Sequence, residues 1–150
     1  MWYIEYPDFP DIPDDLLRLS FDELKTNCRF VGNQTAMDQE IYGAFVDTQA
    51  HQLIRVIRPY FDFNIHAIIY QYIGKNIIMH KDLHRTEAWN YLIDTGGDDV
   101  VTNWYDDEKN LLHSEVIPPR TWHKFNTGLF HDVNNITGKR FSITINKETI

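Results

Sequence analysis

From about residue 63 onward, the chain alternates apolar and polar residues in short stretches that polar turns interrupt. Alternation with a period of two is typical of strands that bury one face. Turn-forming clusters such as Gly96-Gly97-Asp98 and Pro118-Pro119 separate these stretches. Eight short strands separated by polar turns favour a β-sandwich or a β-barrel. The predicted strands are residues 64–73, 77–82, 87–94, 99–105, 111–117, 121–126, 129–134 and 140–146.

The N-terminal part of the chain follows a different pattern, in which apolar residues recur at helical spacing. Residues 7–13 contain three prolines, which predicts an extended or turn-rich start. A short helix is expected over residues 14–24, and a second over residues 48–58, which Pro59 ends. Two helices ahead of a strand-rich region predict helices that pack on the outside of a sheet. Residues 26–40 are a candidate for a lid over a binding site.

Three residues in the strand-rich part have the chemistry of a metal site. His80 and Asp82 are two positions apart, and residues at that spacing on an extended segment point to the same face. Their imidazole and carboxylate can therefore bind one metal ion together, and His131 can complete the set from a distant strand. Two imidazoles and one carboxylate leave open positions on the opposite side of the metal, which suits Fe(II) oxygen chemistry.

The His-x-Asp pair alone is a weak signal, because the chain has 7 His and is rich in acidic residues. His113 and Glu115 form a competing pair with the same spacing, although a solvated strand face explains them better. The alternative for His80 and Asp82 is a hydrogen bond without a metal, and for His131 it is an ordinary half-buried histidine. The metal-site hypothesis therefore depends on the whole ordered set.

The last predicted strand adds a candidate anion site. Its side chains alternate, so that one face carries apolar residues and the other carries Arg140 and Ser142; the apolar residues are Phe141, Ile143 and Ile145. An arginine that points into a barrel needs a buried anion, because an unpaired buried guanidinium is very costly. The alternative is a surface arginine that pairs with an aspartate at the start of the strand.

The order His80-x-Asp82, His131, Arg140-x-Ser142 resembles that of the Fe(II)/2-oxoglutarate-dependent dioxygenases, including small prolyl-hydroxylase-like members. The resemblance covers residues 64–146. It implies a mainly β fold, a double-stranded β-helix or jelly roll of the cupin type. Residues 63–146 would form the jelly-roll core, and residues 1–62 would be a helical or extended lead-in that packs on the barrel. Residues 1–150 are expected to be a single domain.

The resemblance also implies the roles of these residues. His80, Asp82 and His131 would bind Fe(II), with 2-oxoglutarate as cosubstrate and O2 as oxidant. Arg140, with Ser142 assisting, would bind the 5-carboxylate of 2-oxoglutarate in a bidentate manner. The implied activity is hydroxylation of a C–H bond in a small molecule or a peptide side chain, with release of succinate and CO2.

Further contacts to the cosubstrate are predicted for two residues. Tyr70, in preference to Tyr72, is a candidate to hydrogen-bond a carboxylate of 2-oxoglutarate, and its alternative is simple core packing. Asn90 is a candidate to bind near the 1-carboxylate, and its alternative is an asparagine bonded to the backbone. Trp104 and Trp122 are candidates for the walls of the pocket, or otherwise plain core residues.

Two other functions remain open at this stage. A cupin-like metalloenzyme that does not use 2-oxoglutarate would be expected to have His-x-His pairs, and this chain has none. A non-catalytic β-barrel binding protein would carry the triad by coincidence. Arg140-Phe-Ser142 after His131 favours the oxygenase over both.

Composition narrows the class of protein. The 150 residues are 43% hydrophobic, which fits one globular unit with a sizeable core. Without a long apolar run or a secretory signal, the chain is expected to be soluble, cytoplasmic and not bound to membranes. The single Cys28 excludes an internal disulfide and a cysteine-based zinc site. The net charge of −8 argues against general nucleic-acid binding, and a homodimer is left open.

Overall fold

The computed structural model describes residues 1–27, 30–34, 38–45, 52–83 and 85–147. In chain order, the elements are β1 (Tyr3–Tyr6), α1 (Asp14–Asn27), β2 (Phe30–Gln34), β3 (Gln39–Phe45), α2 (Gln52–Ile57), the 3-10 helix η3 (Arg58–Tyr60), β4 (Ile65–Ile73), β5 (Ile77–His80), β6 (Glu87–Asp94), β7 (Val101–Tyr105), β8 (Leu111–Glu115), β9 (Trp122–Asn126), β10 (Phe130–Asn134) and β11 (Arg140–Lys147).

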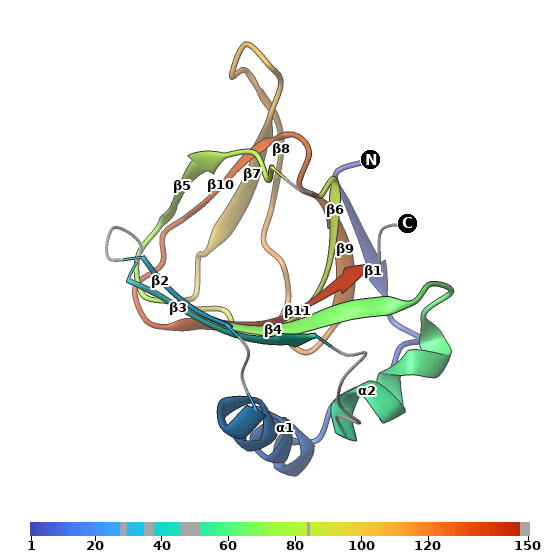
Figure 1. Ribbon diagram of the computed structural model, residues 1–150. Coiled ribbons are helices and arrows are strands. Elements are labelled where there is room, and N and C mark those ends of the chain that lie inside the picture. The colour runs from blue at the N-terminus through green and yellow to red at the C-terminus, as the bar shows by residue number, and fades with distance from the viewer. Residues whose placement is uncertain (28–29, 35–37, 46–51, 84, 148–150) are drawn as a thin grey trace.

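The strands form two sheets that face each other (Figure 1). The large sheet has seven strands in the order β1-β9-β6-β11-β4-β3-β2, and the minor sheet has four in the order β5-β10-β7-β8. Every pairing in both sheets is antiparallel. This architecture is the jelly roll that the sequence predicted.

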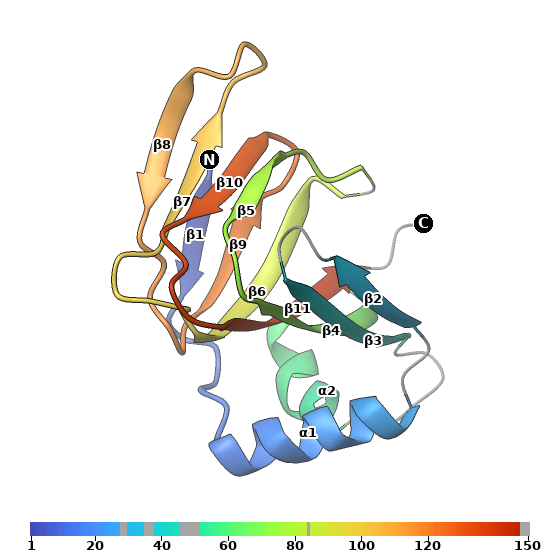
Figure 2. The ribbon, with the colours of Figure 1, turned by 90° about the vertical axis from the view of Figure 1, so that its left-hand side faces the viewer.

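Helices α1 and α2 both lie against the outer face of the large sheet (Figure 2). Leu17 and Leu24 of α1 and Leu53 of α2 are buried in one cluster with outward-facing residues of the sheet, among them Ile143 and Ile145. The first turn of α1 carries Asp14 and Asp15, whose negative charges favour a helix N-terminus. Within the described residues, no helix combines the length and the apolar character needed to cross a membrane.

The eight strands predicted for the C-terminal part are confirmed, with ends that differ by a few residues. Both predicted helices are also found: residues 48–51 of the second lie outside the described residues, and its described part, Gln52–Ile57, gives way to η3 around Pro59. The sequence analysis missed three strands in the N-terminal part, because β1, β2 and β3 also join the large sheet. The described part of the candidate lid, residues 26–40, holds β2 and the start of β3, an edge hairpin.

The two faces of β11 have different surroundings, as its alternation predicted. Ile143 and Ile145 are fully buried against the helices, whereas Arg140 and Ser142 line a cavity between the sheets. The helix-covered face therefore supplies much of the apolar burial, and the inner face is left for polar side chains.

This division predicts where the fold is sensitive to truncation. Replacement of Ile143 by Ala should lower the free energy of unfolding by about 2–5 kcal/mol, because it leaves a cavity under α1. Leu19→Ala, at an exposed position of α1, is the control and should change it by less than about 0.5 kcal/mol. Urea titrations followed by circular dichroism measure both. Equal losses in the two variants would contradict this account of the core.

Candidate metal centre

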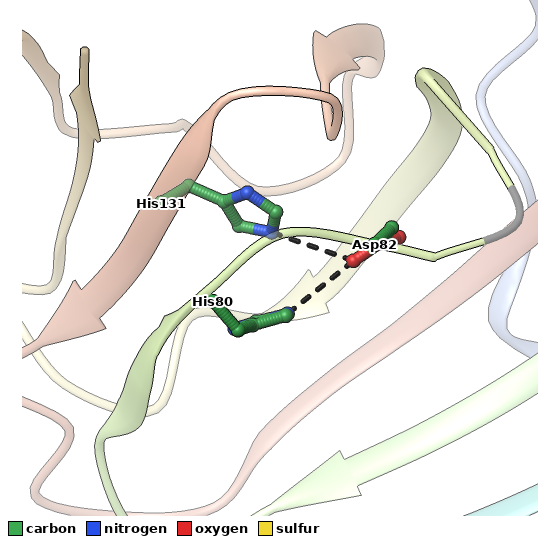
Figure 3. Close-up of side chains that lie close together, drawn as sticks. All are labelled: His80, Asp82 and His131. Atoms are coloured by element: carbon green, nitrogen blue, oxygen red, sulfur yellow. Dashed lines mark ion pairs between the residues drawn. The ribbon is translucent and has the colours of Figure 1, made fainter. Parts of the chain in front are cut away.

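Strands β5 and β10 bring the triad of His80, Asp82 and His131 together. His131 lies directly opposite His80 in the strand pairing, and the two ring centroids are 4.4 Å apart. β5 ends at His80, so Asp82 lies in the following loop, whereas the predicted strand extended to residue 82. Its Oδ1 lies 3.3 Å from Nε2 of His80 and 3.7 Å from Nε2 of His131 (Figure 3). One ligand atom of each residue lies within 4.8 Å of the others, close enough to hold one metal ion.

The orientation of both imidazoles is set by the backbone. Nδ1 of His80 lies 2.7 Å from the carbonyl oxygen of Ile78, and Nδ1 of His131 lies 2.8 Å from that of Leu129. A carbonyl oxygen only accepts, so each Nδ1 must donate. In the neutral ring this leaves the lone pair on Nε2, which is the atom that faces Asp82. Such a bond on the far ring nitrogen is the usual way in which proteins orient a metal-binding histidine.

Thr127 fixes the loop that carries Asp82. The backbone N–H of Asp82 donates to the carbonyl oxygen of Thr127 at 3.0 Å, and the N–H of Thr127 donates to that of Thr86 at 3.0 Å. The hydroxyl of Thr127 donates to the carbonyl oxygen of Arg85 at 3.1 Å. Because the fully buried Thr127 lies just before β10, these bonds hold the loop against the strand that carries His131.

The charges of the triad suit a metal cation. Burial acts to raise the pKa of Asp82, but the hydrogen bond with His80 and the charge of Arg85 outweigh it, and the pKa falls to about 2. The hydrogen bond with Asp82 raises the pKa of His80, whereas burial lowers the pKa of His131. At neutral pH the site therefore offers an ionised carboxylate, and protonation of the histidines would oppose the binding of a metal ion.

A cavity of about 350 Å³ extends between the sheets from the triad to Arg140. Arg140 is only 9% exposed, and one of its N–H groups donates to the carbonyl oxygen of Thr95 at 2.9 Å. Gly96, the residue after Thr95, has a φ of 82°, and a Cβ at this position would lie 2.9 Å from the Cβ of Arg140. The turn that presents the Thr95 carbonyl to Arg140 therefore requires glycine.

Arg140 is a buried cation without a carboxylate partner among the described residues. Burial lowers its pKa to about 10, which still leaves the guanidinium charged at neutral pH. The alternative of a surface arginine paired with an aspartate therefore does not hold. A charge in this position favours an anionic ligand in the cavity, because its desolvation is otherwise poorly compensated.

Ser142 and Asn90 also line the cavity, as the sequence led us to expect. Asn90 lies on β6 opposite Thr144 of β11, whose hydroxyl donates to Oδ1 of Asn90 at 2.8 Å. Since this bond occupies the amide oxygen, the Nδ2 group of Asn90 is the part that can donate to a ligand. Both residues approach from the large sheet, whereas the histidines of the triad come from the minor sheet.

Tyr70 lies on the other side of the large sheet from the cavity. It is opposite Ile143 in the β4–β11 pairing, and its hydroxyl donates to the carbonyl oxygen of Leu17 in α1 at 3.5 Å. Tyr72 shares this face and stacks on Phe141, with ring centroids 4.1 Å apart. The role predicted for Tyr70 in binding the cosubstrate is therefore not supported, because the sheet separates it from the triad.

The remaining candidates lie elsewhere. Trp122 belongs to the cluster beneath the helices, and Trp104 belongs to a smaller core cluster, so neither lines the cavity. Nε2 of His113 lies 2.8 Å from Oε2 of Glu115 on β8, at the edge of the minor sheet. That pair forms no part of the triad.

Five polar residues that the sequence analysis missed line the cavity: Gln39, Gln71, Arg85, Thr102 and His123. His123 is almost fully buried, and its Nδ1 lies 3.3 Å from the carbonyl oxygen of Thr121. Burial lowers its pKa to about 4. The signal for His123 was present in the alternation of strand 121–126, which places it opposite the outward-facing Trp122.

Comparison with known proteins identifies solved structures that have a similar fold. No protein-family model matches the chain, and no curated protein sequence matches it. Among solved structures, it is similar to an oxidoreductase of the 2OG-Fe(II) oxygenase family from Burkholderia pseudomallei, with a TM-score of 0.64 and 14% sequence identity. The similarity covers 96% of this chain and 84% of that one.

Two prolyl hydroxylases have a similar structure. One is the Trichoplax adhaerens prolyl hydroxylase in complex with a peptide fragment of the hypoxia-inducible factor oxygen degradation domain, with a TM-score of 0.60, 11% identity and coverage of 95% and 81% of the two chains. The other is a Pseudomonas putida prolyl-4-hydroxylase, with a TM-score of 0.55, 12% identity and coverage of 97% and 92%. At these identities the likeness establishes the fold, and the residues of the site must carry any argument about function.

The buried His123 predicts that mild acid destabilises the protein. In the unfolded chain this histidine takes up a proton near pH 6.5, whereas in the folded protein it does so only near pH 4. Its contribution to stability is therefore intact above pH 6.5 and is lost as the pH falls towards 4. The loss should reach about 3 kcal/mol, at about 1.4 kcal/mol per pKa unit.

The measurement is the free energy of unfolding in urea at intervals between pH 7 and pH 4, for the wild type and for His123→Phe. The variant should keep the contributions of His80 and His131 and lose only the part due to His123. A slope with pH that is identical in the two proteins would contradict the burial of a neutral imidazole at this position.

Proposed function

We propose that the chain is a non-haem Fe(II)- and 2-oxoglutarate-dependent oxygenase. The observation that carries the proposal is one cavity whose lining includes two chemically different groups. One group is the triad of His80, Asp82 and His131, and the other is the guanidinium of Arg140, which has no carboxylate partner among the described residues. A dicarboxylate with a keto group carries the chemistry for both, because one carboxylate and the keto oxygen can chelate a metal and the far carboxylate can pair with the guanidinium.

The donor set fits Fe(II). Two imidazole nitrogens oriented by backbone carbonyls and one ionised carboxylate face a common point, and this ligand set is typical of non-haem iron oxygenases. When bound, the iron with 2-oxoglutarate and O2 supplies the oxidation that hydroxylates a C–H bond and yields succinate and CO2.

The protein's own groups position the reactants. Arg140 binds the 5-carboxylate through its free N–H groups, and Ser142, two residues along the same face of β11, assists it. Asn90 offers its Nδ2 group to the cosubstrate from β6. The apolar residues that complete the lining, such as Leu92 and Val133, limit the access of water to the reacting atoms.

The substrate approaches from an open groove that meets the cavity at the triad. This groove has a volume of about 1030 Å³ and shares His80, Asp82 and Arg85 with the cavity. The groove is large enough for a small molecule or for the side chain of a bound peptide. The peptide bound to the Trichoplax enzyme is a precedent for the second class on a similar fold.

Removal of Asp82 tests the metal-binding part of the cavity. Asp82→Ala should abolish the 2-oxoglutarate turnover that is measured as succinate formed from Fe(II), O2 and cosubstrate, because the only anionic ligand is lost. Its far-ultraviolet circular dichroism should match that of the wild type, since the side chain is not part of either core cluster. Undiminished succinate formation in this variant would remove Asp82 from the site.

Arg140 provides the test of the anion-binding part of the cavity. In anaerobic Fe(II)-loaded protein, titration with 2-oxoglutarate should produce a weak visible charge-transfer band. Arg140→Ala should need about 10–100-fold more cosubstrate for the same band, because charge-assisted hydrogen bonds contribute about 1.5–3 kcal/mol. Lys139→Ala removes the neighbouring exposed cation and should leave the titration unchanged.

An unchanged cosubstrate affinity in Arg140→Ala would contradict the proposed role of the buried guanidinium. The absence of any band in the wild type, with iron not retained, would instead favour a binding protein on the same β-barrel fold.

A further inference from the structure

The two oxygens of Asp82 have different surroundings. Oδ1 faces Nε2 of both triad histidines, at 3.3 and 3.7 Å. Oδ2 points away from them and accepts a hydrogen bond from Nε of Arg85 at 2.5 Å. A carboxylate with both oxygens free can bind a metal through one oxygen or through both. The bond from Arg85 removes this choice by occupying the second oxygen.

Arg85 is held in place at more than one point. A second N–H of the guanidinium donates to Oδ1 of Asn146 on β11 at 2.8 Å. The backbone carbonyl of Arg85 accepts a hydrogen bond from the hydroxyl of Thr127. The backbone carbonyl of Thr127 in turn accepts a hydrogen bond from the N–H of Asp82. The guanidinium therefore connects Asp82 on the minor-sheet side to Asn146 on the large sheet. A planar group with donors in a fixed fork can make both bonds at once, which the single ammonium group of a lysine does poorly.

The position of Arg85 also matters for the open side of the site. It lines both the cavity and the groove, so it lies at the junction where cosubstrate and substrate meet. If Oδ2 of Asp82 were free to turn towards the metal, the carboxylate would occupy a second coordination position. One coordination position fewer would then remain on the metal for the two chelating oxygens of 2-oxoglutarate and for O2.

We propose that Arg85 is a positioning residue for the metal centre: it holds Oδ2 of Asp82 so that the carboxylate binds the metal through Oδ1 alone. This inference rests on the proposed function, because it requires a metal ion at the triad. It assigns to Arg85 a role that an ordinary ion pair within a loop would not have, since that pair would affect only stability.

The test uses Co(II), which binds such sites without reacting with O2 as iron does. Co(II) is titrated into the metal-free full-length protein by calorimetry, and its visible absorption is recorded, because the intensity of these bands depends on coordination number. Arg85→Gln removes the charge and the fork, and its shorter side chain loses the bond from Nη1 to Asn146. Its Co(II) affinity should fall about 10–100-fold, the range seen when partners of metal ligands are removed, and its absorption bands should change intensity.

Two further variants separate positioning from general effects. Asn146→Ala releases one side of the guanidinium and should produce a smaller loss of affinity. Lys81→Gln is the matched control, because Lys81 lies in the same loop but pairs with Asp107 at 2.5 Å and not with Asp82. This control should bind Co(II) as the wild type does, with the same spectrum. Urea unfolding of each metal-free variant gives its stability independently of the metal.

Each outcome decides between the hypotheses. Wild-type Co(II) affinity and an unchanged spectrum in Arg85→Gln would overturn the role of Arg85 while leaving the proposed function intact. A loss of stability in the metal-free variant with an unchanged spectrum would also overturn it. If Arg85→Gln does not fold, Arg85→Lys takes its place and should bind Co(II) with intermediate affinity. Failure of the wild type to bind Co(II), or binding that Asp82→Ala does not weaken, would overturn the proposed function and this inference together.

Discussion

The register between β5 and β10 is the constraint on which the candidate site depends. His80 and His131 are direct partners across these two strands, so the distance between their rings is a property of the sheet. Because side chains alternate between faces, a slip of one residue would turn one of the histidines to the outer face. Five residue pairs with β7 fix β10 on its other side. The bonds of Thr127 then add Asp82 to the same frame.

The part of the cavity around Arg140 depends on the large sheet instead of the minor sheet. Its energetics are dominated by the desolvation of a buried charge. Arg140 is positioned by β11, which pairs along most of its length with β4 and β6. Its charge is buried with a backbone carbonyl as its only described hydrogen-bond partner, which costs stability in the empty protein. The net charge of the protein is −8, and yet no carboxylate of the described residues pairs with this buried cation. An anionic ligand would supply the missing negative charge beside Arg140, and binding of that ligand should stabilise the fold.

The sequence was most informative where alternation was strong. It predicted the eight C-terminal strands. It also predicted the two faces of β11, because the opposite orientation of that strand would place the charge of Arg140 among the apolar residues under the helices. It failed for Tyr70, since the face of a residue on β4 depends on its partner on β11, and the partner is Ile143 and not Ser142. Gln71 is the partner of Ser142 and lines the cavity instead. Such pairings join distant segments and leave no local signal.

The missed strands have a similar physical explanation. β2 contains Gly32 and carries a weak β pattern, so its strand structure comes from pairing with β3, and that of β3 from pairing with β4. These additions extend the surface that the helices cover. A sheet whose inner face carries Gln71, Asn90, His123, Arg140 and Ser142 gains little from burying that face. Most of its apolar burial is on the outer face, where α1 and α2 pack on Ile143 and Ile145, and only a smaller cluster around Leu92 forms on the inner face. The helices thus allow the inner face to be polar, which is the condition for a charged cavity in a chain of this length.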